Sequence, residues 1–138
     1  MNIYTDLAQL KSIKNPVVTT GTFDGVHLGH QKIIARIKQL AKEIGGETVL
    51  LTFYPHPRTV LFPDDDDLKL LNTQAEKIEL LKTYGIDNLI IQPFTREFSR
   101  LSSIEFVRNI LVNSIKTKCL VIGYNHHFGR NREGSFEH

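Results

Sequence analysis

Apolar positions along the chain recur with two different periods, and the alternation between them predicts the fold. Four short runs, 16–20, 47–53, 88–92 and 118–122, are nearly continuous in apolar and β-branched residues. Such runs are typical of strands in a sheet that is buried on both faces. Between the first two runs the apolar residues recur every three or four positions, which predicts a helix from Gly29 onward. Its apolar face consists of Ile33, Ile34, Ile37, Leu40, Ala41 and Ile44.

Local signals predict where the helices begin and end. Capping boxes, in which a Ser or Thr and a Glu three residues later cap each other's backbone N–H groups, predict helices over 75–84 and from 103 to about 113. Glycines predict helix ends at 45 and 85, because glycine readily adopts the left-handed backbone that ends a helix. The residues that carry these signals are Thr73 and Glu76, Ser102 and Glu105, and Gly45, Gly46 and Gly85.

The order of these elements indicates an α/β protein. Strands that alternate with helices favour a parallel sheet, because parallel neighbours need crossover connections. We therefore expect a Rossmann-like, doubly wound sheet whose ligands bind at the carboxyl ends of the strands. The loops that leave the strands at that edge are 21–30, 54–70, 93–101 and 123–134. Only loop-like sequence follows the fourth strand, so we expect the sheet to be truncated at its C-terminal end.

Composition narrows the class of protein further. A chain of 138 residues suits one domain, and its formal net charge of +2 is too small to indicate nucleic-acid or membrane attraction. The start of the chain lacks the layout of a secretory signal, and no apolar stretch reaches the roughly 20 residues of a membrane helix. Cys119 is the single cysteine and resembles a small buried hydrophobe of a reducing compartment. We expect a cytoplasmic protein.

Residues 21–30, GTFDGVHLGH, join the first strand to the first helix and carry three glycines and two histidines. Their spacing matches neither the dinucleotide fingerprint G-x-G-x-x-G nor a Walker A loop. A glycine-rich turn at a helix N-terminus nevertheless favours a phosphate, because backbone N–H groups and the helix dipole point toward it. His27 and His30 lie one helical turn apart, so both imidazoles are able to face the same anion.

Two other interpretations of this segment stay open. In one, it is a structural turn that carries two surface histidines. In the other, imidazoles bind zinc, and the available side chains are His27, His30, His56, His126 and His127. The zinc interpretation is the weaker one, because three-residue spacing alone is not specific and no His-Glu-x-x-His motif is present.

Later loops carry further candidate residues. The loop 53–62, FYPHPRTVLF, presents apolar side chains around two prolines, which suits either a slot for a planar ring or packing on the core. The loop 123–134 contains Arg130 and Arg132, which match phosphate geometry, unless it is simply a mobile basic loop. We interpret the acidic run 64–67 as solvated, because consecutive aspartates cannot all face one cation.

The glycine–histidine segment and three later blocks together resemble a known family. Residues 21–30 are similar to the H-x-G-H signature of the nucleotidylyltransferase superfamily, in the fuller form G-x-F-D-G-V-H-x-G-H. That form looks like the FAD synthetase module of prokaryotic bifunctional riboflavin kinase/FAD synthetases. TFYPHP (52–57), FSRLSSIEFV (98–107) and GYNHHFG (123–129) resemble later blocks of this family in the same order. The resemblance implies that AMP passes from ATP to FMN, which gives FAD and pyrophosphate, with Mg²⁺.

The resemblance also implies roles for individual residues. It assigns His27 and His30 to the ATP phosphates, with His30 nearest to the transferred phosphorus, and Asn125 to the meeting point of the substrates. Nucleotide contacts are implied at Gly21, Thr22, Phe23, Asp24, Gly25 and Gly29. Flavin contacts are implied at Pro55, His56, Pro57, Phe62 and Phe128. No side chain is implied as a metal ligand.

The sequence departs from the family pattern in two respects. The family usually has an aromatic residue at the position of His126, so the wall of the flavin site differs here. The downstream I-S-S-T-x-I-R block and the riboflavin kinase domain are both missing from the sequence. We therefore expect residues 1–138 to be an FMN adenylyltransferase domain that is incomplete at its C-terminal end. The alternatives are a nucleotide- or flavin-binding fragment without turnover, and an adenylyl- or cytidylyltransferase with another substrate.

Overall fold

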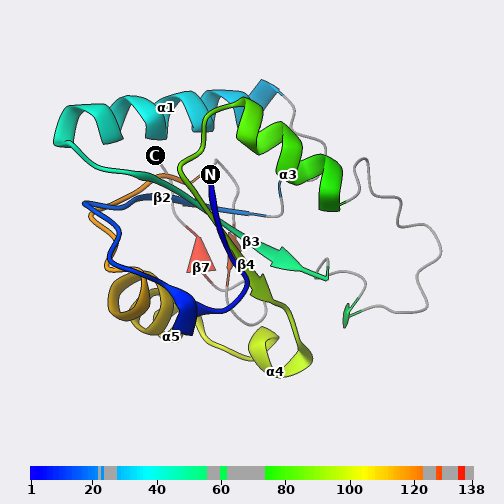
Figure 1. The fold of residues 1–138 in the computed structure, drawn as a ribbon. Helices are drawn as coiled ribbons and strands as arrows, with labels where there is room; N and C mark the ends of the chain where they lie inside the picture. The colour runs from blue at the N-terminus through cyan, green and yellow to red at the C-terminus, as the bar shows by residue number, and fades with distance from the viewer. Residues whose placement is uncertain are drawn as a thin grey trace.

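The computed structural model describes residues 1–21, 23, 28–55, 60–61, 74–122, 127–128 and 134–135. Its regular elements follow the expected alternation of strand and helix (Figure 1). The strands are β1 (Asn2–Tyr4), β2 (Val17–Thr20), β3 (Thr48–Tyr54), β4 (Asn88–Pro93), β5 (Cys119–Leu120), β6 (His127–Phe128) and β7 (Gly134–Ser135). The helices are η1 (Leu7–Gln9), α1 (Leu28–Ile44), α3 (Gln74–Thr83), α4 (Arg96–Ser99), α5 (Ser103–Phe106) and η2 (Val107–Ser114).

Five strands form one parallel sheet in the order β1-β4-β3-β2-β5. The central strand β3 pairs with β2 on one side, where Val18 lies opposite Val49, and with β4 on the other, where Leu50 lies opposite Leu89. The outer strands β1 and β5 also run parallel to their neighbours. This arrangement confirms the predicted parallel sheet of an α/β protein.

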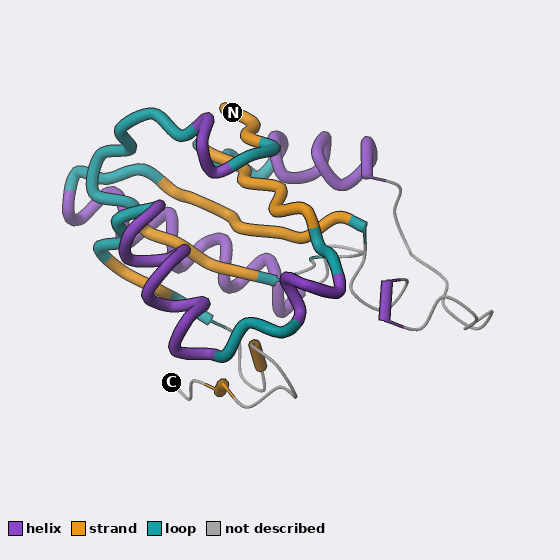
Figure 2. The backbone as a smooth tube through the Cα atoms, turned by 90° about the horizontal axis from the view of Figure 1, so that it is seen from below, coloured by secondary structure: helices purple, strands orange, loops and turns teal. Residues whose placement is uncertain are grey.

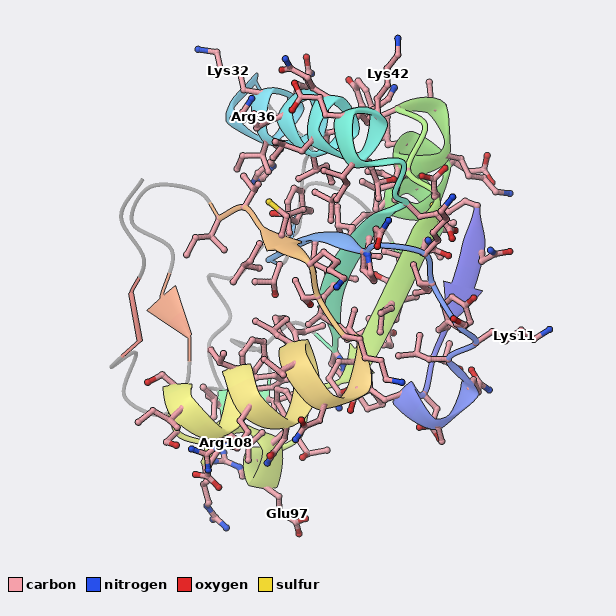
Figure 3. The ribbon with its side chains drawn as sticks, turned by 90° about the vertical axis from the view of Figure 1, so that its left-hand side faces the viewer. Lys11, Lys32, Arg36, Lys42, Glu97 and Arg108 are labelled. Carbon is pink, nitrogen blue, oxygen red and sulfur yellow. The ribbon has the colours of Figure 1, made fainter. Side chains whose placement is uncertain are left out.

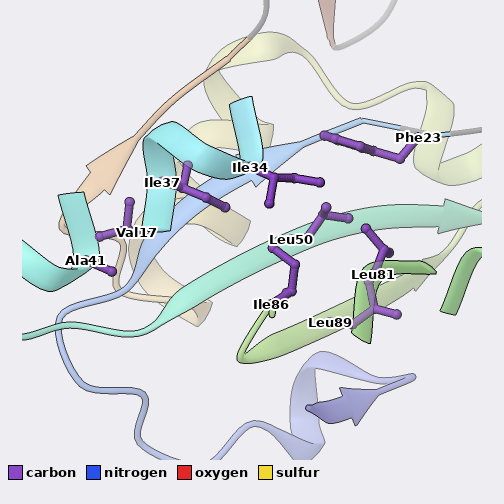
Figure 4. Packing of buried hydrophobic residues seen from close by; sticks show 9 residues of the cluster. All are labelled: Val17, Phe23, Ile34, Ile37, Ala41, Leu50, Leu81, Ile86 and Leu89. Atoms are coloured by element: carbon purple, nitrogen blue, oxygen red, sulfur yellow. The ribbon is translucent and has the colours of Figure 1, made fainter. Parts of the chain in front are cut away.

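Helices cover both faces of the sheet. Figure 1 shows α1 and α3 on one side and α4 and α5 on the other, and Figure 2 shows the same layers from below. Because side chains alternate along a strand, neighbouring residues of β3 enter different cores. Leu50 packs in a cluster with residues of α1 and α3, whereas Val49 and Leu51 pack in a cluster with residues of α5 and η2. The first cluster is drawn in Figure 4, and many of the charged side chains point away from the layers, as Figure 3 shows for Lys32, Lys42 and Arg108.

The helix boundaries follow the local signals. Gly45 adopts a φ of +64°, as expected for a residue that ends a helix, and the N–H of Gly46 donates to the carbonyl of Ala41 at 2.7 Å. Ser102 and Glu105 form the predicted capping box. The Thr73 capping box lies outside the described residues.

Several elements differ from the prediction. The helix that Ser102 opens continues as a π-helix from Val107, since Ile115 donates to the carbonyl of Ile110, five residues earlier. Ile44 was expected on the buried face of α1 but is 45% exposed, because it occupies the last position of the helix, where the chain turns away. The edge strand β5 is shorter than the predicted 118–122, and Cys119 is half-buried.

Other elements have no counterpart in the prediction. These are β1, the short helices η1 and α4, and the antiparallel pair of β6 and β7, which lies in a region predicted to be all loop. Among the described helices, none is long and apolar enough to cross a bilayer.

Candidate functional site

The candidate site lies where the central strands end. The N–H of Gly21, just after β2, donates to the carbonyl of Leu51 in β3 at 3.0 Å. The N–H of Phe94, just after β4, donates to the carbonyl of Tyr54 at the end of β3, also at 3.0 Å. The segments that follow β2, β3 and β4 therefore leave the sheet from one edge, as predicted for a ligand site in such a fold.

His30 and Phe23 form the described part of the glycine–histidine segment. His30 lies in the first turn of the 17-residue helix α1, and it is half-buried, with its Nδ1 atom turned into the protein. Its ring lies against the ring of Phe23, with the ring centroids 4.5 Å apart and the planes inclined by 37°. Phe23 is itself buried, only 3% exposed. An imidazole beside a helix N-terminus suits contact with an anion, because it donates hydrogen bonds where the helix dipole is positive.

A buried lysine lies at the same edge of the sheet and was not predicted. Lys77 of α3 is only 7% exposed, and its Nζ donates to Oγ1 of Thr52, near the end of β3, at 3.1 Å. Helical periodicity contains the signal that would have found it, because Lys77 lies one turn before the fully buried Leu81. This side chain brings a cation to the carboxyl edge of the sheet, on the face covered by α1 and α3.

The opposite face of the same edge is aromatic. Phe53 of β3 lies within 6.3 Å, between ring centroids, of Phe94, Phe98 and Phe106, and these contacts include edge-to-face pairs. Phe106 is buried, whereas the other three rings are partly exposed. Sequence analysis identified Phe53 as part of an apolar loop but did not predict the other three rings. Partly exposed rings at this edge provide flat apolar surface for a planar ligand.

A second contact ties this region to the loop after β3. A guanidinium nitrogen of Arg96, the first residue of α4, lies 3.5 Å from the carbonyl of Leu61, at the limit of a hydrogen bond. Tyr54, which is exposed, joins Pro55 through a cis peptide bond. The start of the predicted flavin loop thus lies beside α4 and the aromatic cluster.

The structure describes only some of the predicted site residues. Gly21, Phe23, His30 and Pro55 are described and lie at the carboxyl edge of the sheet, and the backbone of Gly29 lies in α1. The backbone of Phe128 lies in β6. Those outside the described residues are Thr22, Asp24, Gly25, His27, His56, Pro57, Phe62 and Asn125.

The two alternatives that involve these histidines stand differently. The zinc interpretation depends on histidine side chains of which only that of His30 is described, and among the described side chains no group of three or more His, Cys, Asp or Glu could hold a metal. The joint action of His27 and His30 on one anion remains a prediction, because His27 is outside the described part of the chain.

Comparison with known proteins places these features in a family. The family model described as FAD synthetase matches residues 9–138. A bifunctional riboflavin kinase/FMN adenylyltransferase of Listeria monocytogenes is 40% identical over 120 residues, which cover 87% of this chain and 38% of that protein. A protein of the same description from Buchnera aphidicola is 35% identical over 136 residues, which cover 98% of this chain and 43% of its own. The chain thus spans about two fifths of the length of these relatives.

A solved structure shares the fold. A crystal structure titled as a macrolide-efflux protein from Streptococcus pneumoniae superposes with a TM-score of 0.81 at 26% identity. The match covers 93% of this chain and 43% of that one. Its title and the names of the sequence relatives point to different activities, so the proposal below depends on the sequence relatives and on the site.

Proposed function

The chain belongs to the FAD synthetase family, and on this basis we propose that it transfers AMP from ATP, supplied as its magnesium complex, to FMN. An oxygen of the FMN phosphate attacks the α-phosphorus of ATP. The bond between that phosphorus and the bridging oxygen of the β-phosphate breaks, and the products are FAD and pyrophosphate. The protein contributes mainly by positioning the two substrates and by balancing the charge that moves during transfer.

The position of His30 carries this proposal. A half-buried imidazole in the first turn of α1, at the edge where ligands of doubly wound sheets bind, is suited to donate a hydrogen bond to a phosphate oxygen. We assign His30 to the transferred phosphate, together with His27. The backbone from Gly21 to Gly29 takes the rest of the nucleotide, and Asp24 braces the turn.

The flavin belongs, in this proposal, on the aromatic side of the edge. Pro55 directly follows β3, and Phe53 of that strand packs with the rings of Phe94 and Phe98. We place the isoalloxazine beside the segment that includes Pro55, His56, Pro57 and Phe62, with Phe128 and Asn125 completing the contacts. The two substrates then meet across the end of β3.

Residues 1–138 form the adenylyltransferase part of this activity in our proposal. The relatives' names include a second activity, riboflavin kinase, and the chain spans about two fifths of their length. We place any kinase activity outside these residues and the reaction in the cytoplasm, in keeping with the free thiol of Cys119.

Replacement of His30 tests the proposal directly. We expect His30→Ala to lower the rate of FAD formation by two to three orders of magnitude, roughly what removal of one charge-stabilising donor costs other enzymes. The assay follows FAD produced from ATP and FMN by the protein at its natural length. Lys42→Ala is the matched control, because it removes a side chain near the other end of the same helix, where it is exposed.

The outcomes separate the alternatives. FAD formation that His30→Ala leaves near its normal rate rejects the role of His30. Calorimetry that detects ATP and FMN binding, with no FAD formed by the unaltered protein, favours a binding fragment without turnover. Turnover of ATP only with another phosphorylated acceptor favours a different adenylyltransferase, and turnover of CTP in place of ATP favours a cytidylyltransferase.

A further inference from the structure

The ring of Phe23 is held on three sides. One face of its surroundings is the apolar cluster between the sheet and helices α1 and α3, which includes Ile34 and Leu81. Figure 4 shows Phe23 at one end of this cluster, beyond Ile34 and close to the end of β2. The second neighbour is the ring of His30, with a centroid separation of 4.5 Å.

The third neighbour is the backbone of Gly21. A Cβ atom added to this glycine would lie 3.0 Å from Cε2 and 3.2 Å from Cδ2 of the Phe23 ring. Distances this short mean that the aromatic ring occupies the space of a side chain at position 21. The glycine is therefore needed for close packing against Phe23, in addition to any part its N–H group plays at the end of the strand.

The backbone of Phe23 is unusual for its residue type. Its φ of +52° lies in the left-handed region, which a bulky non-glycine residue rarely adopts. This conformation turns the side chain back into the core, where the ring is 3% exposed. A strained conformation of this kind persists only when surrounding contacts over-determine it, and such residues concentrate at functional sites.

We propose that Phe23 is a positioning residue for the imidazole of His30. The core and Gly21 fix the aromatic ring, and the ring in turn limits the directions in which the imidazole can point. The imidazole thereby meets the phosphate already oriented, so that none of its rotational freedom is lost at the moment of transfer. This inference rests on the proposed function, because the orientation matters only if His30 contacts the reacting phosphate.

The test compares Phe23→Leu with Ile37→Val in the protein at its natural length. Leucine keeps position 23 apolar but removes the ring, whereas Ile37→Val trims the same core cluster two turns farther along α1. Two properties are measured: the NMR signals of the His30 ring in histidine-labelled protein without substrate, and the kinetics of FAD formation. The His30 signals are identified by their absence from the spectrum of His30→Asn.

We expect Phe23→Leu to move the His30 signals by several line widths, because the ring current of Phe23 is lost. We also expect kcat to fall roughly 10- to 100-fold with a smaller change in the KM for ATP, as for a catalytic group that is misplaced by about 1 Å. Ile37→Val should change neither property. Gly21→Ala retains every core side chain but pushes on the Phe23 ring, and it should reproduce both effects even if Phe23→Leu fails to fold.

Each contrary result has a definite meaning. Unmoved His30 signals in both variants, or a fall in kcat no larger than that of Ile37→Val, overturn the role of Phe23 while the role of His30 stands. Normal FAD formation by His30→Ala overturns the role of His30 and this inference together. The two failures are distinguishable, because only the second one leaves His30→Ala active.

Discussion

Two buried threonines on neighbouring strands show how differently the same side chain contributes at the residue scale. The hydroxyl of Thr48 donates to the carboxylate of Asp87 at 3.1 Å and accepts from the backbone N–H of Asp87 at 2.8 Å. The hydroxyl of Thr19 is equally buried, yet it has no hydrogen-bond partner within the described chain. A buried hydroxyl without a partner costs free energy, whereas a bonded one stabilises the fold.

Valine substitutions at these two positions should therefore have different effects. We expect Thr48→Val to lower the free energy of unfolding by about 1–3 kcal/mol, because the backbone N–H of Asp87 loses its acceptor. Thr19→Val has nearly the same shape and breaks no hydrogen bond, so it should be neutral or slightly stabilising. Urea unfolding of the two variants measures the difference, and equal destabilisation would show that the hydrogen bonds of Thr48 are not the cause.

Residues differ in how well the sequence announces them. His30 was predicted, because its spacing from Gly21 and His27 is visible in the sequence and its place at a helix start follows from the pattern. The contact between Phe23 and His30 was not predicted, since it depends on a left-handed backbone at Phe23 that no periodicity reveals. Lys77 was missed although its spacing from Leu81 was available, because a lysine is normally assigned to the exposed side of a helix.

At the scale of elements, the end of α1 depends on two adjacent glycines for different reasons. Gly45 needs its left-handed backbone, with a φ of +64°, but a Cβ atom added there would meet nothing within 4 Å. A Cβ atom at Gly46 would lie 2.2 Å from the backbone oxygen of Asn15, in the segment that leads into β2. The first glycine lets the helix end, and the second lets the chain pass close to the neighbouring segment.

Alanine at each position should separate the two requirements. Gly45→Ala places a Cβ in the left-handed region, which costs about 1–2 kcal/mol. Gly46→Ala should destabilise more than that, because the contact is with backbone, which cannot rotate away as a side chain can. The comparison uses chemical denaturation at constant temperature, with Gly45→Asn as a control that tolerates the left-handed conformation. A smaller loss for Gly46→Ala than for Gly45→Ala would contradict this account.

The elements predicted from the sequence are those with strong patterns. Strands β2, β3 and β4 were found because their residues are apolar and β-branched on both faces, and α1 because its apolar face repeats over its whole length. The edge strand β1 was missed, since it has only three residues and Asn2 and Ile3 are exposed. The π geometry of η2 was also missed, because it shifts hydrogen bonds by one residue without changing which residues are apolar.

At the scale of the whole molecule, burial is concentrated on the central strand. Leu50 and Leu51 of β3 are fully buried, and they face opposite cores. By contrast, β1 lies at the edge of the sheet and has one paired neighbour. Local stability in a protein follows such differences in packing and in the number of paired neighbours.

Amide hydrogen exchange should reflect this gradient. We expect the amides of Leu50 and Leu51 to exchange slowest, at the rate set by unfolding of the whole domain, and the amide of Ile3 to exchange faster through fraying of the edge. Exchange monitored by NMR under native conditions gives the rates residue by residue. Equal protection of Ile3 and Leu50 would mean that the sheet opens only as a unit.

The overall topology was only partly predictable. Alternation of strands and helices predicts parallel pairing, and from this the convergence of loops at one edge follows. The place of β1 beside β4, which brings residues 2–4 against residues 88–90, could not be inferred, because nothing in a three-residue strand selects its neighbour.

The alternation of side chains in β3 has one more consequence. Thr52 points toward the ammonium group of Lys77, and the next residue, Phe53, points toward the phenyl rings of the other layer. Two consecutive positions thus divide polar from hydrophobic surroundings at the rim of the sheet. Inserting or deleting a single amino acid upstream within this strand would exchange the two, turning a benzyl group toward the cation and a hydroxyl toward the hydrocarbon.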